Sequence, residues 1–215
     1  MIRRPTILII ALCLIALGAT EALAKPKKGF LTGPYLTLEI GLAQIDYDTD
    51  QVTGQMIGND IEPTFGFLFG WNIYDPFSVE LQGRYATNPF ADRRMHIANA
   101  NVYGKWHFIL DALTDFKTFR IIPFLKGGAG MRIGVLPGSA NATNNTVIQL
   151  GYGPSFGGGI SFLWHKYFYF GIDVQEDLFI YDEVRQNVSG VPNTLVYRGG
   201  FHPSLGAMVI LGVHY

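Results

Sequence analysis

Cysteine, charge and long hydrophobic runs are all scarce in this chain of 215 residues. Its one cysteine, Cys13, leaves no internal disulfide and no cysteine-based metal site to expect. Charged residues make up 15% of the sequence, well below the roughly 25% of soluble domains, and a net charge of −1 provides no basic surface for nucleic acid. After residue 24 there is no apolar run of about 18 residues, so no membrane-spanning helix is expected there.

What the chain has instead is alternation. Hydrophobic residues make up 48% of it, and at the C-terminus they occupy every second position, as Leu205, Ala207, Val209, Leu211, Val213 and Tyr215. A strand with one apolar face and a terminal aromatic ring fits a barrel wall that meets lipid outside and a filled or wet lumen inside. Closing the sheet satisfies every backbone group within the membrane. The pattern therefore indicates an outer-membrane barrel.

The N-terminus has the pattern of a secretory signal peptide. Arg3 and Arg4 precede an apolar stretch over residues 7–19, and the run Ala22, Leu23, Ala24 supplies a cleavage motif of small residues. We expect residues 1–24 to be removed on export, together with the cysteine. Residues 25–215 are then expected to form a single barrel domain in a Gram-negative cell envelope.

Seven further segments alternate as the C-terminal one does, and together they predict an all-β, eight-stranded antiparallel up-and-down transmembrane barrel. In chain order the segments are residues 36–43, 64–72, 77–85, 98–108, 124–133, 152–162, 168–175 and 204–215. Long polar connections are expected near residues 46–60, 86–95, 135–147 and 178–194, and mostly shorter ones near 74–76, 109–118 and 163–166. Because outer loops are long and inner turns short in such barrels, both termini are predicted to be periplasmic.

Two prolines complicate the sixth and eighth segments. Pro154 and Pro203 each remove one backbone donor from the strand ladder. Both lie towards the predicted outer rim, where bulges are common. A bulge at either proline would reverse the facing of the residues above it, so the strand boundaries there stay open.

The residues between the apolar ones are predicted to face the lumen, where charged side chains collect. These are Glu39, Glu80, Arg84, Lys105, His107, Lys126, Arg132, Asp173 and Arg198. The interior of an eight-stranded barrel is about wide enough for its own side chains to fill it. We therefore expect either a static core of ion pairs or a narrow gated pore, with a weak anion preference because bases outnumber acids in the set. No cofactor, metal or catalytic residue is expected.

All three tryptophans fall on the lipid-facing parity where the descending strands end, and so does the last residue. These are Trp71, Trp106, Trp164 and Tyr215, and they are predicted to form an aromatic girdle at the membrane interface. A soluble lipocalin-like barrel is the rival fold. Its outer face would need many Lys and Glu, whereas the polar face here is mostly Gly, Ser, Thr and Asn.

One pair of residues resembles a nucleophile with its base. His202 and Ser204 are two positions apart, so that they share one face of a strand and could approach each other. The pair resembles the His-x-Ser element of outer-membrane lipid A deacylases, which are also eight-stranded barrels. In that family an Asn follows the Ser and an acidic residue lies further on, whereas here Leu205 follows and no acid does. A lipid A-modifying hydrolase is therefore kept only as a less favoured alternative.

Three segments, residues 33–41, 77–85 and 123–130, resemble the small OmpA/OmpX-type outer-membrane barrels. Glu80 and Arg84 match the lumenal charges that this family carries on its third strand. The resemblance implies a non-enzymatic barrel that acts structurally or through four extracellular loops, or else a narrow porin-like pore. It also implies outer-membrane lipid, lipopolysaccharide and the barrel-assembly machinery as partners, and we expect a monomer.

Overall fold

The computed structural model describes nine stretches of the chain. They are residues 31–45, 61–90, 93–109, 119–137, 146–164, 167–182, 184–188, 191–197 and 200–215. The predicted signal peptide, residues 1–24, and the predicted lumenal residue Arg198 lie outside these stretches. No helix in the described part of the chain is long and apolar enough to cross a membrane.

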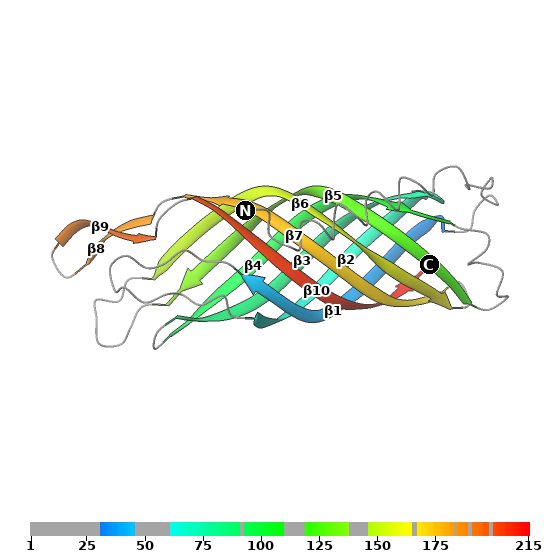
Figure 1. The fold of residues 1–215 in the computed structure, drawn as a ribbon, viewed down its shortest axis with the longest axis horizontal. Helices are drawn as coiled ribbons and strands as arrows, with labels where there is room; N and C mark the ends of the chain where they lie inside the picture. Colours follow the sequence, from blue (N-terminus) through cyan, green and yellow to red (C-terminus); the bar gives the residue numbers. More distant parts are fainter. Residues whose placement is uncertain are drawn as a thin grey trace, which may run out of the picture.

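Eight antiparallel strands form one closed barrel in the order β1-β10-β7-β6-β5-β4-β3-β2 (Figure 1). The strands are β1 (Gly33–Ile45), β2 (Ile61–Tyr74), β3 (Phe77–Phe90), β4 (Arg93–His107), β5 (Phe119–Leu136), β6 (Val147–Trp164), β7 (Phe168–Tyr181) and β10 (Gly200–His214). β1 and β10 close the wall in a continuous register from the pair Tyr35 and His214 to the pair Ile45 and Ser204. The predicted all-β, eight-stranded up-and-down barrel is confirmed.

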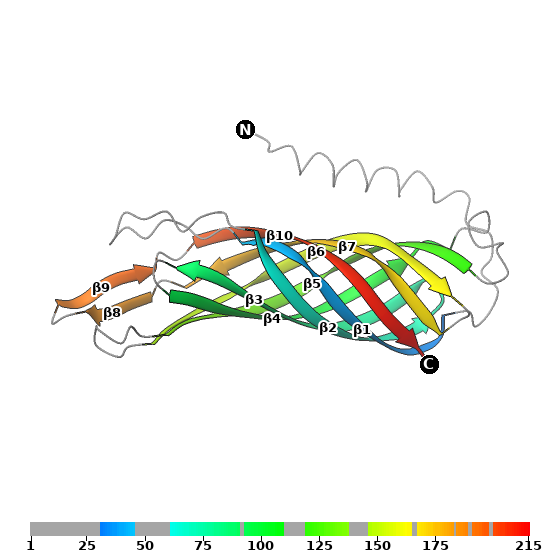
Figure 2. The same cartoon turned by 90° about the horizontal axis from the view of Figure 1, so that it is seen from below.

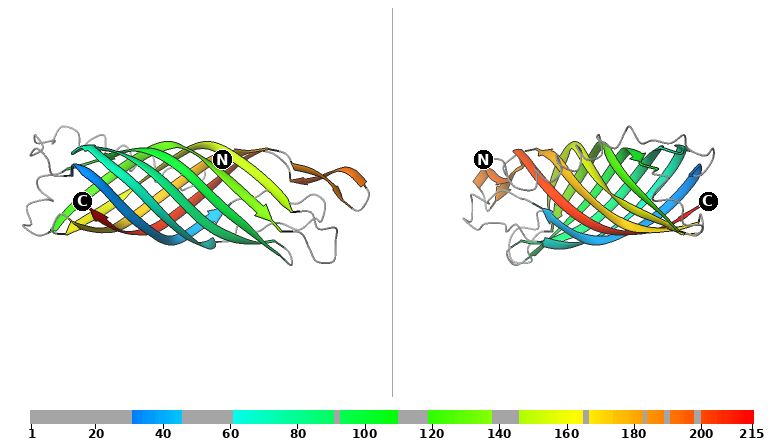
Figure 3. Two further views of the ribbon diagram at one scale, coloured as in Figure 1. Left: turned by 180° about the vertical axis from the view of Figure 1, so that it is seen from behind. Right: turned by 45° about the vertical axis from the view of Figure 1, so that its right-hand side comes forward.

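The strands are strongly tilted with respect to the long axis of the barrel (Figure 3). A separate two-stranded hairpin, β8 (Val184–Val188) and β9 (Val191–Tyr197), extends beyond the wall at the end opposite to the C-terminus (Figure 2). The end that holds the C-terminus is called the inner end below, and the end that holds this hairpin is called the outer end. β1 begins at the inner end, and β2 and β10 finish there, because Gly33 lies opposite Asn72 and Tyr35 lies opposite His214.

Two connections that the sequence predicted as loops are largely strand. β3 continues to Phe90 and β4 begins at Arg93, so residues 91 and 92 alone separate them, instead of a loop over 86–95. Likewise, β7 runs on to Tyr181 and the rest of the 178–194 segment includes β8. The polar residues there do not alternate with apolar ones, but a backbone ladder needs no such alternation once the strand has left the hydrocarbon.

The alternating apolar and polar residues of the sequence face the outside and the lumen of the barrel in turn. In β1, Leu38 is 60% exposed on the outside, whereas Thr37 and Glu39 beside it are 2% and 1% exposed in the lumen. The prolines do not disturb this pattern: Pro203 pairs with Leu178, and the β5–β6 register passes through Pro154 without a shift. The pairing of β6 with β7 is interrupted at Gly153 and Pro154, but the register is the same on either side. No bulge occurs at either proline.

Two glycines of the inner wall make room for tyrosine rings. Gly70 lies opposite Tyr35 in the β1–β2 ladder, and a Cβ atom on Gly70 would stand 2.1 Å from the Tyr35 ring. Gly212 lies opposite Tyr169 in the same way, with a Cβ distance of 2.4 Å. In this position the Tyr35 hydroxyl reaches Ser78 and Glu80 of β3.

Candidate functional site

Alternate residues of the wall strands point into the lumen, and many of those residues are charged. Eight of the nine residues expected there lie in the described part of the chain, and all eight are buried, with exposures between 1% and 7%. They are Glu39, Glu80, Arg84, Lys105, His107, Lys126, Arg132 and Asp173. A ninth buried charge, Asp177, was missed because the seventh strand was expected to end near residue 175. Asp177 lies two residues beyond Gln175 and four beyond Asp173, so it faces the lumen as they do. This alternation is the sequence feature that could have identified it.

The middle of the lumen holds a chain of ion pairs that joins four strands. The Arg84 guanidinium contacts Glu39 at 2.7 Å through Nε and Asp173 at 3.3 Å through a second nitrogen. Asp173 also accepts a hydrogen bond from Lys126. The amide of Gln82 donates to both oxygens of Glu39, at 2.8 and 3.1 Å. Glu39 is thus held by two donors from β3, and Asp173 by one donor from β3 and one from β5.

The inner part of the lumen holds a second cluster around Glu80. Its Oε1 accepts from Lys105 at 2.8 Å and from the Tyr35 hydroxyl at 2.5 Å. Ser78 lies between Tyr35 and His107, at 3.1 Å from the Tyr35 hydroxyl and 3.1 Å from Nε2 of His107. Lys105 also lies 4.1 Å above the Phe124 ring, which adds a cation–π contact. Wall strands β1, β3, β4 and β5 are tied together here.

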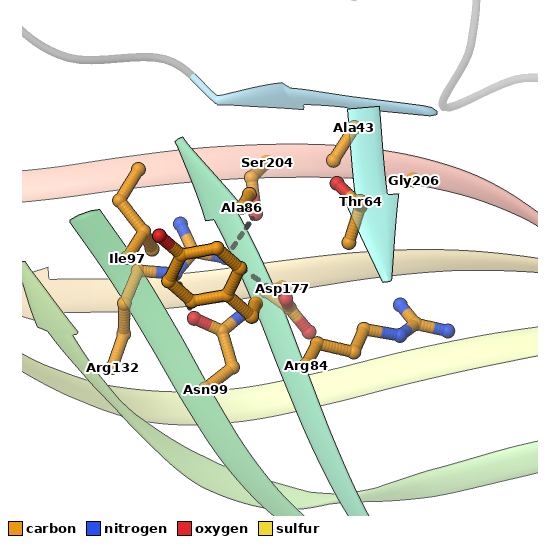
Figure 4. Close-up of a pocket in the computed structure, with 11 residues that line it drawn as sticks. Ala43, Thr64, Arg84, Ala86, Ile97, Asn99, Arg132, Asp177, Ser204 and Gly206 are labelled. Atoms are coloured by element: carbon orange, nitrogen blue, oxygen red, sulfur yellow. Dashed lines mark hydrogen bonds and ion pairs between the residues drawn. The ribbon is translucent and has the colours of Figure 1, made fainter. Parts of the chain in front are cut away.

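The outer part is organised by one arginine (Figure 4). Arg132 donates to Asp177 at 3.0 Å, to Ser204 Oγ at 2.7 Å, to the Tyr181 hydroxyl at 2.9 Å and to Asn99 at 2.8 Å. Its guanidinium carbon also lies 4.8 Å from the centroid of the Phe179 ring. All three nitrogens of the guanidinium therefore donate to residues that line the lumen, so that Arg132 holds several wall strands together.

Charge in the described lumen is balanced. The ion pairs join four carboxylates to four cations, so the excess of bases that the sequence predicts is reduced to His107 among the residues described. The missed Asp177 accounts for one difference, and Arg198 lies outside the described part. The cations are Arg84, Lys105, Lys126 and Arg132, and the carboxylates are Glu39, Glu80, Asp173 and Asp177.

Little free space remains among these side chains. One cavity lies at the outer part, beside Arg84, Arg132 and Asp177, and another at the inner part, beside Lys105, His107 and Tyr169. Each has room for about two water molecules. The described part of the lumen is therefore a packed polar core, interrupted by small hydrated spaces.

The four aromatic residues expected at a membrane interface lie on the outside of the wall. Trp71, Trp106 and Trp164 are 53%, 40% and 53% exposed, and Tyr215 is 74% exposed. β2, β4, β6 and β10 all run towards the inner end, and these residues lie at or within three residues of where they finish. The four rings therefore share one end of the barrel.

His202 and Ser204 do not form a nucleophile and base. The His202 ring contacts Tyr181, with centroids 5.4 Å apart, while the hydroxyl of Ser204 accepts a hydrogen bond from Arg132. Ser204 is 5% exposed. Its hydroxyl is thus part of the outer ion cluster.

Comparison with known proteins identifies the fold. No protein-family model and no curated protein sequence matches this chain. Among solved structures, Neisserial surface protein A is similar over 88% of this chain and 100% of its own, with a TM-score of 0.57 at 8% identity. The outer membrane protein OprG from Pseudomonas aeruginosa is similar over 87% and 98%, with a TM-score of 0.53 at 12% identity.

The outer membrane protein AlkL, studied in lipid bilayers, is similar over 90% of this chain and 95% of its own, with a TM-score of 0.53 at 12% identity. At such identities the likeness establishes the fold alone. That fold is the one that small outer-membrane barrels share, as the resemblance to the OmpA/OmpX type predicts.

Proposed function

We propose that this chain is an integral outer-membrane protein whose barrel is a closed scaffold without enzymatic activity. It acts structurally or through the segments that it presents at its outer end, and both termini are periplasmic. The observation that carries the proposal is the division of the wall: large apolar side chains outside, and balanced, paired charges inside. A wall of this kind is stable where its outer face meets hydrocarbon.

The apolar outer face supports a membrane location. Phe67, Val102, Ile148 and Leu211 are each more than half exposed, and they come from every second strand around the barrel. In water, apolar surface on all sides of a molecule favours aggregation, because monomeric soluble proteins rarely expose continuous apolar patches beyond a few hundred Å². The names of OprG and AlkL as outer membrane proteins, and of NspA as a surface protein, point to the same location.

The aromatic residues at the inner end support the orientation. Trp and Tyr are enriched at the membrane–water boundary, where their rings contact both lipid and headgroups. The wall connections at this end include the two-residue turn at Asp75 and Pro76, whereas the outer end carries the β8–β9 hairpin. Short inner turns and larger outer excursions are the usual arrangement of bacterial barrels.

The packed lumen favours a scaffold over the alternative of a narrow gated pore. An ion that passes Arg84 would have to separate it from Glu39 or Asp173, and breaking a buried ion pair costs about 3–5 kcal/mol. The whole protein, refolded and added to a planar bilayer, should give no steady conductance in potassium chloride. Steps of defined conductance that the Arg84→Ala variant enlarges would establish the pore instead.

The hydrolase alternative is the least favoured, because the Ser204 hydroxyl is hydrogen bonded to Arg132. Overproduction of the protein should leave the mass spectrum of lipid A unchanged. A new deacylated species that the Ser204→Ala variant abolishes would contradict a non-enzymatic role. Lipopolysaccharide, membrane lipid and the barrel-assembly machinery are the partners that we propose for a monomeric barrel.

A further inference from the structure

The outside of β4 changes character towards its outer end. From the inner end the outward-facing residues are Trp106, Gly104, Val102, Ala100 and Ala98, and then His96 and Arg94. Both basic side chains are exposed on the same face of the strand as the apolar residues. On the other side of the barrel the corresponding rim positions stay apolar, as with Ile180 at 49% and Phe201 at 58% exposure.

The height of this change is that of a membrane boundary. Ten residues separate Trp106 from His96, which is about 33 Å along the strand and about 25 Å along the axis at a tilt of about 40°. The apolar band of an outer-membrane barrel is about 25 Å tall. With Trp106 at the inner boundary, His96 therefore lies at the outer one, and Arg94 lies about 5 Å further out, among the lipid headgroups.

The His96 ring is held in place by a tyrosine of the neighbouring strand. Tyr85, on β3, lies 2.6 Å from Nδ1 of His96 through its hydroxyl, and the two rings stack at 27° with centroids 6.1 Å apart. When a tyrosine hydroxyl donates to Nδ1 of a neutral imidazole, the imidazole proton is on Nε2. Nε2 is then a hydrogen-bond donor that the stacked tyrosine leaves free to meet an acceptor.

Among the residues that the structure describes, the cross-strand partners of His96 and Arg94 are uncharged, and Arg94 pairs with Pro89. His96 pairs with Thr87 on β3 and with Val135 on β5. The outward-facing carboxylate Glu176 is on β7, which β5 and β6 separate from β4. A ligand at this position therefore meets two donor groups and the hydroxyl-bearing ring of Tyr85.

From these observations we infer that Arg94, His96 and Tyr85 form a binding site for the phosphate group of an outer-leaflet lipid. The inference rests on the proposed membrane location. Arginine binds phosphate through two parallel hydrogen bonds, and the Nε2 donor of His96, about 6.7 Å along the strand, can reach a second oxygen of the same headgroup. A phosphorylated glycolipid is the occupant that fits the height of His96 and Arg94, because its phosphates lie at the boundary between acyl chains and sugar.

The test uses the whole protein refolded in an uncharged detergent and titrated with three probes. These are lipid A with both phosphates, the same lipid A after removal of its phosphates, and inorganic phosphate. Binding is measured by native mass spectrometry, and the Nε2 resonance of His96 is followed by NMR. The phosphorylated lipid should bind at least about ten-fold more tightly than the dephosphorylated one and should shift the His96 signal.

Matched variants separate the site from general effects. Arg94→Gln should weaken binding of phosphorylated lipid A about ten-fold, and Tyr85→Phe by a smaller factor. Arg120→Gln removes the same charge near the inner end of β5, and Tyr152→Phe removes a rim hydroxyl from β6. Both controls should leave the affinity unchanged, and the thermal unfolding of every variant is recorded.

Each contrary result has a distinct meaning. Equal affinity of Arg94→Gln and the parent protein overturns the site, and so does an equal loss in Arg120→Gln. Inorganic phosphate that binds as tightly as the lipid would show a free-anion site and contradict the assignment to a lipid. Insertion of the refolded protein into phosphatidylcholine vesicles is followed by its gel mobility shift. Absence of that shift would instead overturn the proposed membrane location.

Discussion

Removing the negative charge of Asp173, in the middle of the lumen, should destabilise the barrel strongly. Asp173 accepts hydrogen bonds from both Lys126 and Arg84, and the three side chains are 3%, 1% and 4% exposed. Asp173→Asn preserves the size of the side chain but leaves Lys126 as a buried cation without its ion-pair partner. Arg84 is less affected, because it keeps Glu39 at 2.7 Å.

Breaking a buried ion pair from one side costs about 3–5 kcal/mol, since the remaining charge has already lost its water. We therefore expect Asp173→Asn to lower the free energy of unfolding by that amount. Because the pair is enclosed, raising the salt concentration should change the loss little, whereas an exposed pair would be screened. The assay is urea unfolding of the protein in phosphatidylcholine vesicles, followed by tryptophan fluorescence.

A double variant tests the reason for the loss. Asp173→Asn combined with Lys126→Met removes the stranded charge, and it should recover a substantial part of the lost stability, because buried pairs are often replaceable by apolar groups. A loss below about 1 kcal/mol in the single variant would refute the reasoning. A double variant no more stable than the single one would do the same.

Two further substitutions probe the wall itself. Leu38→Arg, on the outer face of β1, should cost about 2–4 kcal/mol of unfolding free energy in vesicles, since it brings a charge into hydrocarbon; a gain in stability would favour a water-facing wall. Gly70→Ala should cost about 1–3 kcal/mol, because its methyl group would meet the Tyr35 ring. The same change in a Tyr35→Leu background should cost less, and an equal cost in both backgrounds would exclude the ring as the cause.

The facing of the wall residues was predictable because it is a local property. An inward or outward position follows from counting along a strand, and so Leu38 and Glu39 could be placed without knowing any partner. Register held even at Pro154 and Pro203, since losing one donor leaves the other ladder contacts of the strand intact. The fold and the composition of the lumen were therefore accessible from sequence.

The contacts within the lumen were not predictable. Arg84 meets Asp173 across 89 positions of sequence, a contact set by the stagger of the strands around the closed wall. The outer parts of β3 and β4 were missed for a different reason. Once a strand leaves the membrane its side chains need not alternate in polarity, and the extension to Phe90 is marked by backbone pairing alone. The Tyr85 and His96 contact depends on that extension.

The central claim is that the apolar rows face lipid, and the protein's own tryptophans provide the test. All three lie on the outer face near one end of the barrel. Refolded into vesicles of lipids brominated at defined depths, the protein should show strong tryptophan quenching by bromine near the headgroup end of the acyl chain and weaker quenching by bromine at the chain terminus. Tryptophan fluorescence unaffected by bromine at every depth, from a protein that stays monodisperse in detergent-free buffer, would contradict the account.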